Sequence, residues 1–204
     1  MVKTKICGIT RIEDAQLAED LGVWAVGFIF YPPSPRYISP EKAREISESL
    51  NKSTKKVGVF VNEKPETVNK IAEIIALDYV QLHGQEPIED CNKLNIPFVK
   101  TVRTIGETEI YSNAYAFLVD AVDTENWGGT GKLADWDFAK SVKSAIGQKP
   151  LILSGGLSAD NIKKALMIVK PDFIDVSSSI ETAPGIKNHL ALAEFLKEII
   201  NDTK

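Results

Sequence analysis

The chain has 204 residues, which suits a single domain over 1–204 and lies near the lower limit of about 200 residues for a complete α/β barrel. Its 24 basic and 28 acidic residues give a net charge of -4, and no basic run is dense enough to follow a nucleic-acid backbone. No apolar stretch approaches a membrane span or a signal peptide, and two cysteines are too few for a disulfide framework. We therefore expect a cytoplasmic protein that binds neither nucleic acid nor membrane.

Strand and helix patterns alternate from the first residues onward. A β-prone run ends at Cys7, and the capping-box spacing of Thr10 and Glu13 predicts that a helix starts directly after it and stops at Gly22. Seven more strands are expected at 25–30, 57–61, 79–82, 98–102, 116–119, 151–153 and 173–176. The helix after each strand is expected to begin near Ser39, Pro65, Pro87, Glu107, Asp135, Ile162 and Leu190, and 107–113 is the most weakly patterned of these segments.

Apolar spacing also predicts which face of each helix is buried. For the first helix these residues are Ile12, Ala15, Ala18 and Leu21, and for the last helix they are Leu190, Ala193, Leu196 and Ile200. Strands that are apolar on both faces and alternate with helices predict a parallel sheet covered by helices. Eight such units close into a single (β/α)8 TIM barrel with eight parallel strands. An open doubly wound sheet is the alternative, but no strand is followed by the G-x-G-x-x-G turn of a dinucleotide site.

Small residues follow the last two strands, as SGG at 154–156 and SSS at 177–179. Such loops let backbone N–H groups approach an anion, and in an α/β barrel these two loops are the usual phosphate site. The alternative is that small residues merely make tight turns. The loop at 128–132, GGTGK, lacks the spacing of a P-loop, and we interpret it as a loop over a ligand.

Cys7 stands at the carboxyl end of its strand, where α/β enzymes place their chemistry. A free cysteine is more often a small buried hydrophobe, which fits Cys91. At the position of Cys7, however, a thiolate could act as a base if its pKa, about 8.5 when unperturbed, were lowered. Lys5, two residues earlier on the same strand face, could supply the positive charge.

Three polar residues follow other strands at the same end. His83 ends strand four and could simply be satisfied by backbone groups, and Asp120 ends strand six and could brace a loop or face Cys7. Arg36, in a proline-stiffened loop, could be solvated or could pair with a carboxylate on a ligand that is charged at both ends. With two histidines and no spaced Cys, His and carboxylate set, no metal site is predicted. A thiol and a carboxylate over a phosphosugar suit metal-free proton transfer.

Seven motifs, taken in order, resemble the phosphoribosylanthranilate isomerase family of tryptophan biosynthesis. They are KICGIT at 5–10, GFIFYPPSPRYISP at 27–40, VGVFVN at 57–62, VQLHGQE at 80–86, GGTGK at 128–132, LSGGL at 153–157 and DVSSS at 175–179. The resemblance implies an aldose–ketose isomerase that needs no cofactor and is a monomer or homodimer. Its substrate would be the phosphosugar N-(5-phosphoribosyl)anthranilate, and its product 1-(2-carboxyphenylamino)-1-deoxyribulose 5-phosphate.

The resemblance also implies roles for individual residues. Cys7 would be the general base that removes the C2 proton, and Asp120 the general acid that protonates the ring oxygen. The expected binding residues are Arg36 for the anthranilate carboxylate, Gln81 and His83 beside it, and the backbone at Gly155, Gly156, Ser177 and Ser178 for the phosphate.

The chain departs from the family pattern at three points. Ser179 replaces a usual glycine, which would strain the phosphate loop if the position needs a positive φ. Trp127 stands where tyrosine is common, and Asp123 is an alternative to Asp120 as the acid. Two other functions fit the same motifs less completely. One is a different phosphosugar epimerase or isomerase, and the other is a phosphosugar-binding module without catalysis.

Overall fold

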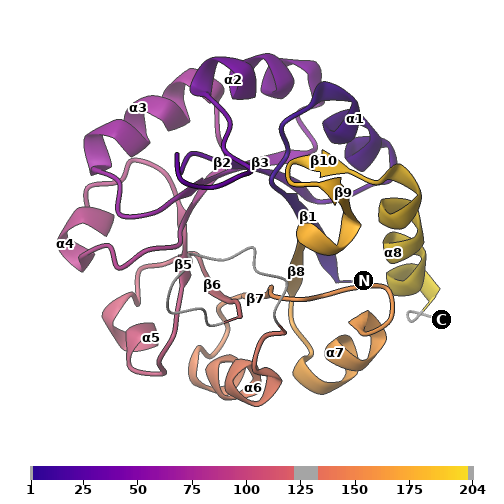
Figure 1. The fold of residues 1–204 in the computed structure, drawn as a ribbon. Helices are drawn as coiled ribbons and strands as arrows, with labels where there is room; N and C mark the ends of the chain where they lie inside the picture. Colours follow the sequence, from indigo (N-terminus) through magenta and orange to yellow (C-terminus); the bar gives the residue numbers. More distant parts are fainter. Residues whose placement is uncertain (1, 122–132, 202–204) are drawn as a thin grey trace.

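The computed structural model describes residues 2–121 and 133–201, and eight parallel strands close into a barrel at its centre (Figure 1). The strands are β1 (Lys3–Cys7), β2 (Ala25–Ile29), β3 (Lys55–Phe60), β4 (Tyr79–Leu82), β5 (Phe98–Thr101), β6 (Ala116–Val119), β7 (Leu151–Leu153) and β8 (Phe173–Val176). Each pairs with the next along the chain, and β1 pairs with β8, Ile6 standing opposite Val176. The predicted TIM barrel is confirmed.

A helix follows each strand and lies on the outside of the barrel (Figure 1). The helices are α1 (Ile12–Asp20), α2 (Pro40–Ser49), α3 (Pro65–Ile75), α4 (Ile88–Cys91), α5 (Glu107–Ile110), α6 (Trp136–Ala145), α7 (Ile162–Val169) and α8 (His189–Asn201). The main apolar core fills the space between helices and strands. Within the described residues, none of these helices has the length and apolarity that crossing a membrane requires.

Two of the predicted helix starts carry a side-chain cap in the structure. The Ser39 hydroxyl accepts a hydrogen bond from the Lys42 N–H before α2, and the Asp135 carboxylate accepts from the Asp137 and Phe138 N–H groups at the start of α6. The capping box of Thr10 and Glu13 is wrong. Arg11 occupies the N-cap without a side-chain bond, and the Thr10 hydroxyl instead donates to the Gly185 carbonyl far along the chain.

The predicted inner faces of the first and last helices are partly wrong. Ala15 and Ala18 of α1 are buried as expected, but Ile12 and Leu21 are exposed. In α8 the first predicted residue, Leu190, is 83 % exposed, and Ala193 is half-buried. Among the described side chains of α8, the buried ones are Leu192, Phe195, Leu196 and Ile199, so the prediction for Leu196 is confirmed. The side chain of the predicted Ile200 lies outside the described part of the helix. Both helices contact a segment that the apolar pattern did not predict.

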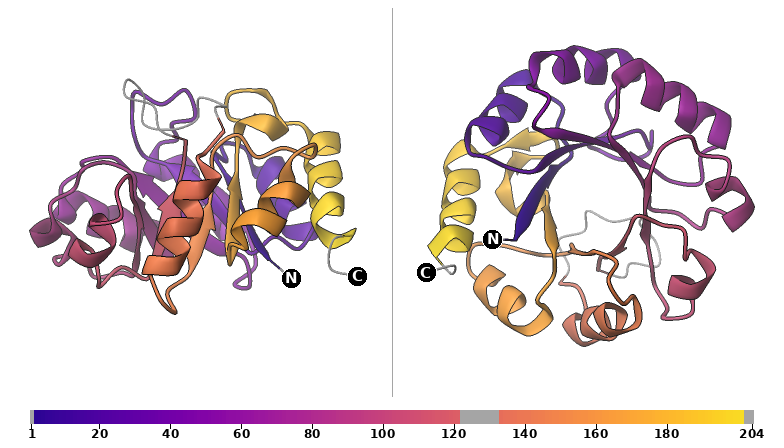
Figure 2. Two further views of the ribbon diagram at one scale, coloured as in Figure 1. Left: turned by 90° about the horizontal axis from the view of Figure 1, so that it is seen from below. Right: turned by 180° about the vertical axis from the view of Figure 1, so that it is seen from behind.

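That segment lies between β8 and α8. It consists of the 3₁₀ turn η1 (Ser178–Ile180) and an antiparallel hairpin of β9 (Glu181–Ala183) and β10 (Ile186–Lys187). The hairpin, drawn in yellow, rises at one end of the barrel, and the N-terminus lies at the other (Figure 2). The carboxyl ends of the parallel strands therefore meet under the hairpin, where the chemistry of α/β barrels is usually found.

Candidate active site

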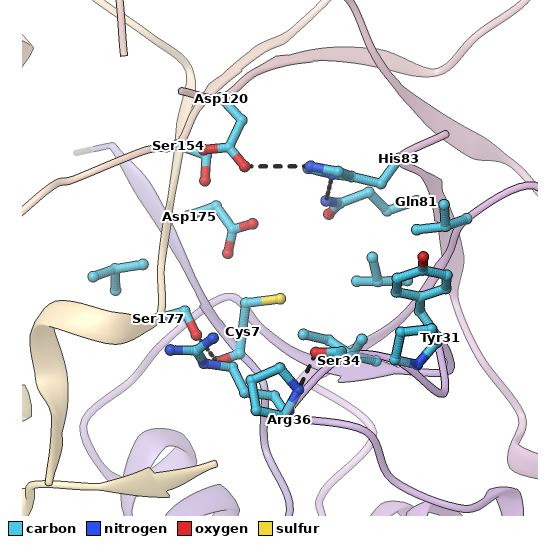
Figure 3. A pocket seen from close by; sticks show the side chains of 16 residues that line it. Cys7, Tyr31, Ser34, Arg36, Gln81, His83, Asp120, Ser154, Asp175 and Ser177 are labelled. Carbon is cyan, nitrogen blue, oxygen red and sulfur yellow. Dashed lines mark hydrogen bonds and ion pairs between the residues drawn. The ribbon is translucent and has the colours of Figure 1, made fainter. Parts of the chain in front are cut away.

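A cavity of about 260 Å³ opens at the carboxyl end of the barrel (Figure 3). The 31–37 loop forms one wall through Tyr31, Pro33, Ser34 and Pro35. The predicted site residues that line the cavity are Cys7, Arg36, Gln81, His83, Asp120 and Ser177. Three of the predicted phosphate residues are outside this lining, namely Gly155, Gly156 and Ser178. Gly155 and Gly156 come directly after the lining residue Ser154, and Ser178 comes directly after the lining residue Ser177. The lining also includes Asp175, which the sequence interpretation did not single out.

Cys7 ends β1, and its sulfur points into the middle of the cavity (Figure 3). Gly27 on the neighbouring strand leaves room for this sulfur, because a Cβ there would lie 2.9 Å from Sγ. Burial and the charge of Asp175 raise the pKa of Cys7, and the positive charges of Lys5 and Lys187 do not offset them. The expected activation by Lys5 is therefore outweighed, and the resting side chain is a thiol.

Asp120 lies on the side of the cavity opposite Cys7 (Figure 3). Its Oδ2 is 3.3 Å from His83 Nε2, and its Oδ1 accepts a hydrogen bond of 2.8 Å from the Ala121 N–H. Burial alone would raise the pKa of Asp120, but the hydrogen bond from His83, the Ala121 N–H and the charge of Lys5 lower it. The resting side chain is therefore a carboxylate.

A chain of hydrogen bonds inside the barrel orients the His83 ring. Lys5 Nζ donates to Asp175 Oδ2 and to Gln81 Oε1, both at 2.7 Å. Because an ammonium group only donates, the carbonyl of Gln81 must face Lys5, which leaves the amide NH₂ to donate to His83 Nδ1 at 3.0 Å. Nδ1 is thus the acceptor, and Nε2 carries the hydrogen that faces Asp120.

Arg36 is not the solvated side chain that its loop position allowed. It is only 7 % exposed, and it makes a two-pronged ion pair with Glu181 of β9. Glu181 in turn accepts a 2.7 Å hydrogen bond from Lys187 Nζ. Glu181 and Lys187 are site residues that the sequence interpretation missed, although the Pro184–Gly185 pair between them is a recognisable turn signal.

The two predicted phosphate loops are joined to each other and to β1. Gly155 and Gly156 have φ of 83° and 61°, and Ser177 Oγ donates to the Cys7 carbonyl at 3.0 Å. The Ser179 hydroxyl donates to the Leu157 carbonyl, and Ser179 is not among the described non-glycine residues with positive φ. Ser179 at this position therefore causes no backbone strain.

Several predicted features lie outside the described residues, namely Asp123, Trp127 and the loop at 128–132. The choice between Asp120 and Asp123 as the acid therefore remains a prediction, with Asp120 on the cavity wall. Within 2–121 and 133–201, no group of three or more His, Cys, Asp and Glu side chains is arranged to hold a metal ion.

Comparisons with known proteins agree with one another over nearly the whole chain. Residues 4–198 match the family model of N-(5'-phosphoribosyl)anthranilate isomerase. The isomerase of that name from Thermotoga petrophila is 44 % identical over 203 residues, covering 97 % of this chain and 98 % of the relative. The crystal structure of phosphoribosyl anthranilate isomerase from Thermus thermophilus superimposes with a TM-score of 0.90 at 34 % identity, covering 98 % and 99 % of the two chains.

A further solved structure carries a bound ligand. It is a phosphoribosyl anthranilate isomerase in complex with reduced 1-(o-carboxyphenylamino)-1-deoxyribulose 5-phosphate. It is 40 % identical to this chain, covers 98 % of this chain and 100 % of its own, and has a TM-score of 0.85.

Proposed function

The chain belongs to the N-(5'-phosphoribosyl)anthranilate isomerase family, and from this premise we propose how its own residues carry the reaction. The enzyme converts N-(5-phosphoribosyl)anthranilate to 1-(2-carboxyphenylamino)-1-deoxyribulose 5-phosphate, an aldose–ketose isomerisation in tryptophan biosynthesis. Two proton transfers are needed. The ring oxygen must gain a proton as the C1–O bond breaks, and the resulting C1 iminium must lose its C2 proton.

We assign the first transfer to Asp120 as general acid and the second to Cys7 as general base. Opening of the furanose ring places positive charge on the C1 iminium, which acidifies the C2–H bond so that a modest base suffices. Loss of the C2 proton gives the enaminol, which tautomerises to the aminoketose. Each assisted transfer typically contributes about 10²–10⁴ in rate. No cofactor or metal ion takes part in these steps.

The two groups rest in the opposite protonation states, because the pKa of Cys7 is raised and that of Asp120 is lowered. The active form is the tautomer in which the proton has moved from the thiol to the carboxylate, so that the total number of protons is unchanged. A bound substrate carries a phosphate and a carboxylate, and their negative charges raise the pKa of a nearby carboxyl group. Substrate binding thus favours the protonated form of Asp120. It favours the thiol form of Cys7 as well, so the proton must still move from the thiol to the carboxylate before the reaction.

We propose that the two charged ends of the substrate are held at different parts of the rim. Arg36 binds the anthranilate carboxylate, with Gln81 and His83 beside the bound ligand. The N–H groups of the phosphate loops bind the other end, from Gly155, Gly156, Ser177 and Ser178. Positive φ at both glycines supports this, since it turns successive N–H groups toward one point. Fixing both ends holds the sugar between acid and base.

The observation that carries the proposal is that Cys7 and Asp120 lie across one cavity that Arg36 and Ser177 also line. The test follows anthranilate fluorescence with freshly made substrate in the presence of a metal chelator. We expect turnover by the wild type, and loss of most of kcat in folded Cys7→Ala and Asp120→Asn variants. Full activity in either variant would refute its assigned role. We also propose that the enzyme is cytoplasmic. We propose further that it is a monomer or a homodimer, and sedimentation of the purified enzyme would decide between these two states.

A further inference from the structure

Arg36 presents only one of its two hydrogen-bonding edges to the protein. Its Nε and Nη2 groups donate to Glu181 Oε2 at 2.9 and 2.8 Å, and Nε also lies 3.1 Å from Oε1. Nη1 makes no hydrogen bond to any residue that the structure describes. The edge formed by Nη1 and the second N–H of Nη2 is therefore free, and this edge matches the two oxygens of a carboxylate.

Glu181 is itself held from several sides. Its Oε1 accepts hydrogen bonds from Lys187 Nζ at 2.7 Å and from the Gly185 N–H at 3.2 Å. Lys187 is 3 % exposed and also donates to the Cys7 carbonyl at 2.6 Å. The hairpin therefore connects the arginine to the backbone of the proposed base, and Glu181 has little freedom to move without Arg36.

Packing fixes the stem of the arginine as well. Gly8 follows Cys7 with a φ of +73°, and a Cβ at this position would lie 2.8 Å from Arg36 Cδ. The guanidinium lies beside Ser177 at the rim of the cavity (Figure 3). Because both stem and head are confined, the direction of the free edge is determined before any ligand binds.

The charges of this cluster favour an anion. Arg36 and Lys187 are cations and Glu181 is an anion, so the three buried side chains carry one net positive charge. Burial would raise the pKa of Glu181, but its bonds to Arg36 and Lys187 lower it, so the carboxylate remains ionised. A buried net charge is costly, and one carboxylate of a ligand neutralises it.

We propose that Glu181, held by Lys187, is a positioning residue that fixes Arg36 so that its free edge selects substrates with a carboxylate on the aryl group. This inference rests on the role proposed above for Arg36. Glu181 does not touch the ligand; it sets the direction from which the ligand's carboxylate is bound. Its loss should therefore weaken binding of carboxylated ligands far more than binding of the same ligands without the carboxylate.

The test is calorimetric binding of two probes. One is reduced 1-(o-carboxyphenylamino)-1-deoxyribulose 5-phosphate, and the other is the same compound without the carboxyl group. Glu181→Gln keeps the shape of the side chain but removes its charge. The cluster then becomes more positive, which by itself favours an anion, but the charge-assisted bonds that fix the direction of Arg36 are lost, and we expect this second effect to dominate and Kd for the first probe to rise tenfold or more. For the second probe we expect a change below about threefold. In an Arg36→Ala background, Glu181→Gln should add no further loss.

A matched control makes the same change in a surface pair. Glu48→Gln breaks the exposed Arg44–Glu48 pair on α2 and should leave both Kd values unchanged. If Glu181→Gln unfolds, Glu181→Asp replaces it in the test. This variant keeps the negative charge beside Lys187, but its side chain is shorter by one methylene group and so shifts Arg36. We then expect the same difference between the two probes in the change of Kd. Equal losses for both probes, or an added loss in the Arg36→Ala background, would overturn the proposal. Failure of the first probe to bind the wild type would instead refute the assigned substrate.

Discussion

His83 Nε2 lies 3.3 Å from Asp120 Oδ2, and the hydrogen on that nitrogen is fixed by a chain that starts at Lys5. Lys5 orients the Gln81 amide, the amide donates to His83 Nδ1, and the ring must then present Nε2–H to the carboxylate. A hydrogen-bond donor toward a carboxylate stabilises its charged form. The barrel interior therefore holds the proposed acid as a carboxylate until a substrate changes the balance.

The first prediction concerns the pH dependence of kcat/KM. The active and resting tautomers contain the same number of protons, so their ratio does not change between the two pKa values. We expect a plateau across neutral pH. In acid, kcat/KM should fall below the ordinary pKa of Asp, about 3.9, because Asp120 and Cys7 are then both protonated. In alkali, it should fall above the ordinary pKa of Cys, about 8.5, because both groups are then ionised. A profile with a limb near pH 7 would contradict these assignments.

The second prediction removes the donor to Asp120. In His83→Leu, burial is no longer offset by the His83 bond, so the pKa of Asp120 should rise and the acid limb should move to higher pH. The measurement is kcat/KM from pH 4 to 8 in both proteins. The other histidine supplies the control, because His189 pairs with Asp14 away from the cavity, and His189→Leu should leave the limb in place. An unchanged limb in His83→Leu would show that the ring does not govern this carboxyl.

The third prediction concerns the glycine where the proposed phosphate loop meets β6. Gly155 has a φ of +83°, and a Cβ there would lie 2.5 Å from the Ala121 nitrogen and 2.8 Å from Asp120 Oδ1. Gly155→Ala must displace one of them, and we expect kcat/KM to fall at least about tenfold with a loss of about 1–3 kcal/mol in stability. Gly106→Ala is the control, since nothing lies within 4 Å and φ is -59°. Equal activity of the two variants would refute the close contact.

The architecture could be predicted because its signals are local. Each strand and helix is marked by its own periodicity, and pairing of successive strands then places Cys7 and Asp120 at the same end of the barrel. Asp120 was identifiable because it directly follows the apolar run FLV, and Cys7 because it ends a β-prone run. Only Ser177 of the four predicted phosphate residues lines the cavity, because loop shape depends on contacts that spacing does not specify.

The remaining site features depend on contacts between distant residues. Lys5 meets Asp175 across 170 positions of sequence, and Arg36 meets Glu181 across 145. A lysine or an aspartate within an apolar strand signals a buried charge, but not which partner neutralises it. The same holds for Thr10, whose capping role was lost because its hydroxyl meets the hairpin at Gly185.

The fourth prediction concerns Lys5, which is 1 % exposed between Asp175 and Gln81. Asp175 Oδ1 already has no hydrogen-bond partner among the described residues, so Lys5→Met would leave its buried carboxylate without a neutralising charge. We expect a loss of about 3–5 kcal/mol in the free energy of unfolding at pH 7, measured in urea. Lys55→Met is the control, because the Lys55–Asp78 pair is partly exposed and should be worth about 1 kcal/mol or less.

The pH dependence separates this cause from a simple packing defect. Burial raises the folded-state pKa of Asp175 above its unfolded value of about 3.9 even beside Lys5, and loss of Lys5 raises this pKa further. The variant therefore loses additional stability as pH rises toward the higher value and regains it in acid. The deficit of Lys5→Met relative to the wild type should thus shrink between pH 7 and pH 5. Adding Asp175→Asn should recover part of it at pH 7. A deficit that is independent of pH and unrelieved by Asp175→Asn would mean that lost packing, rather than an unpaired charge, destabilises the variant.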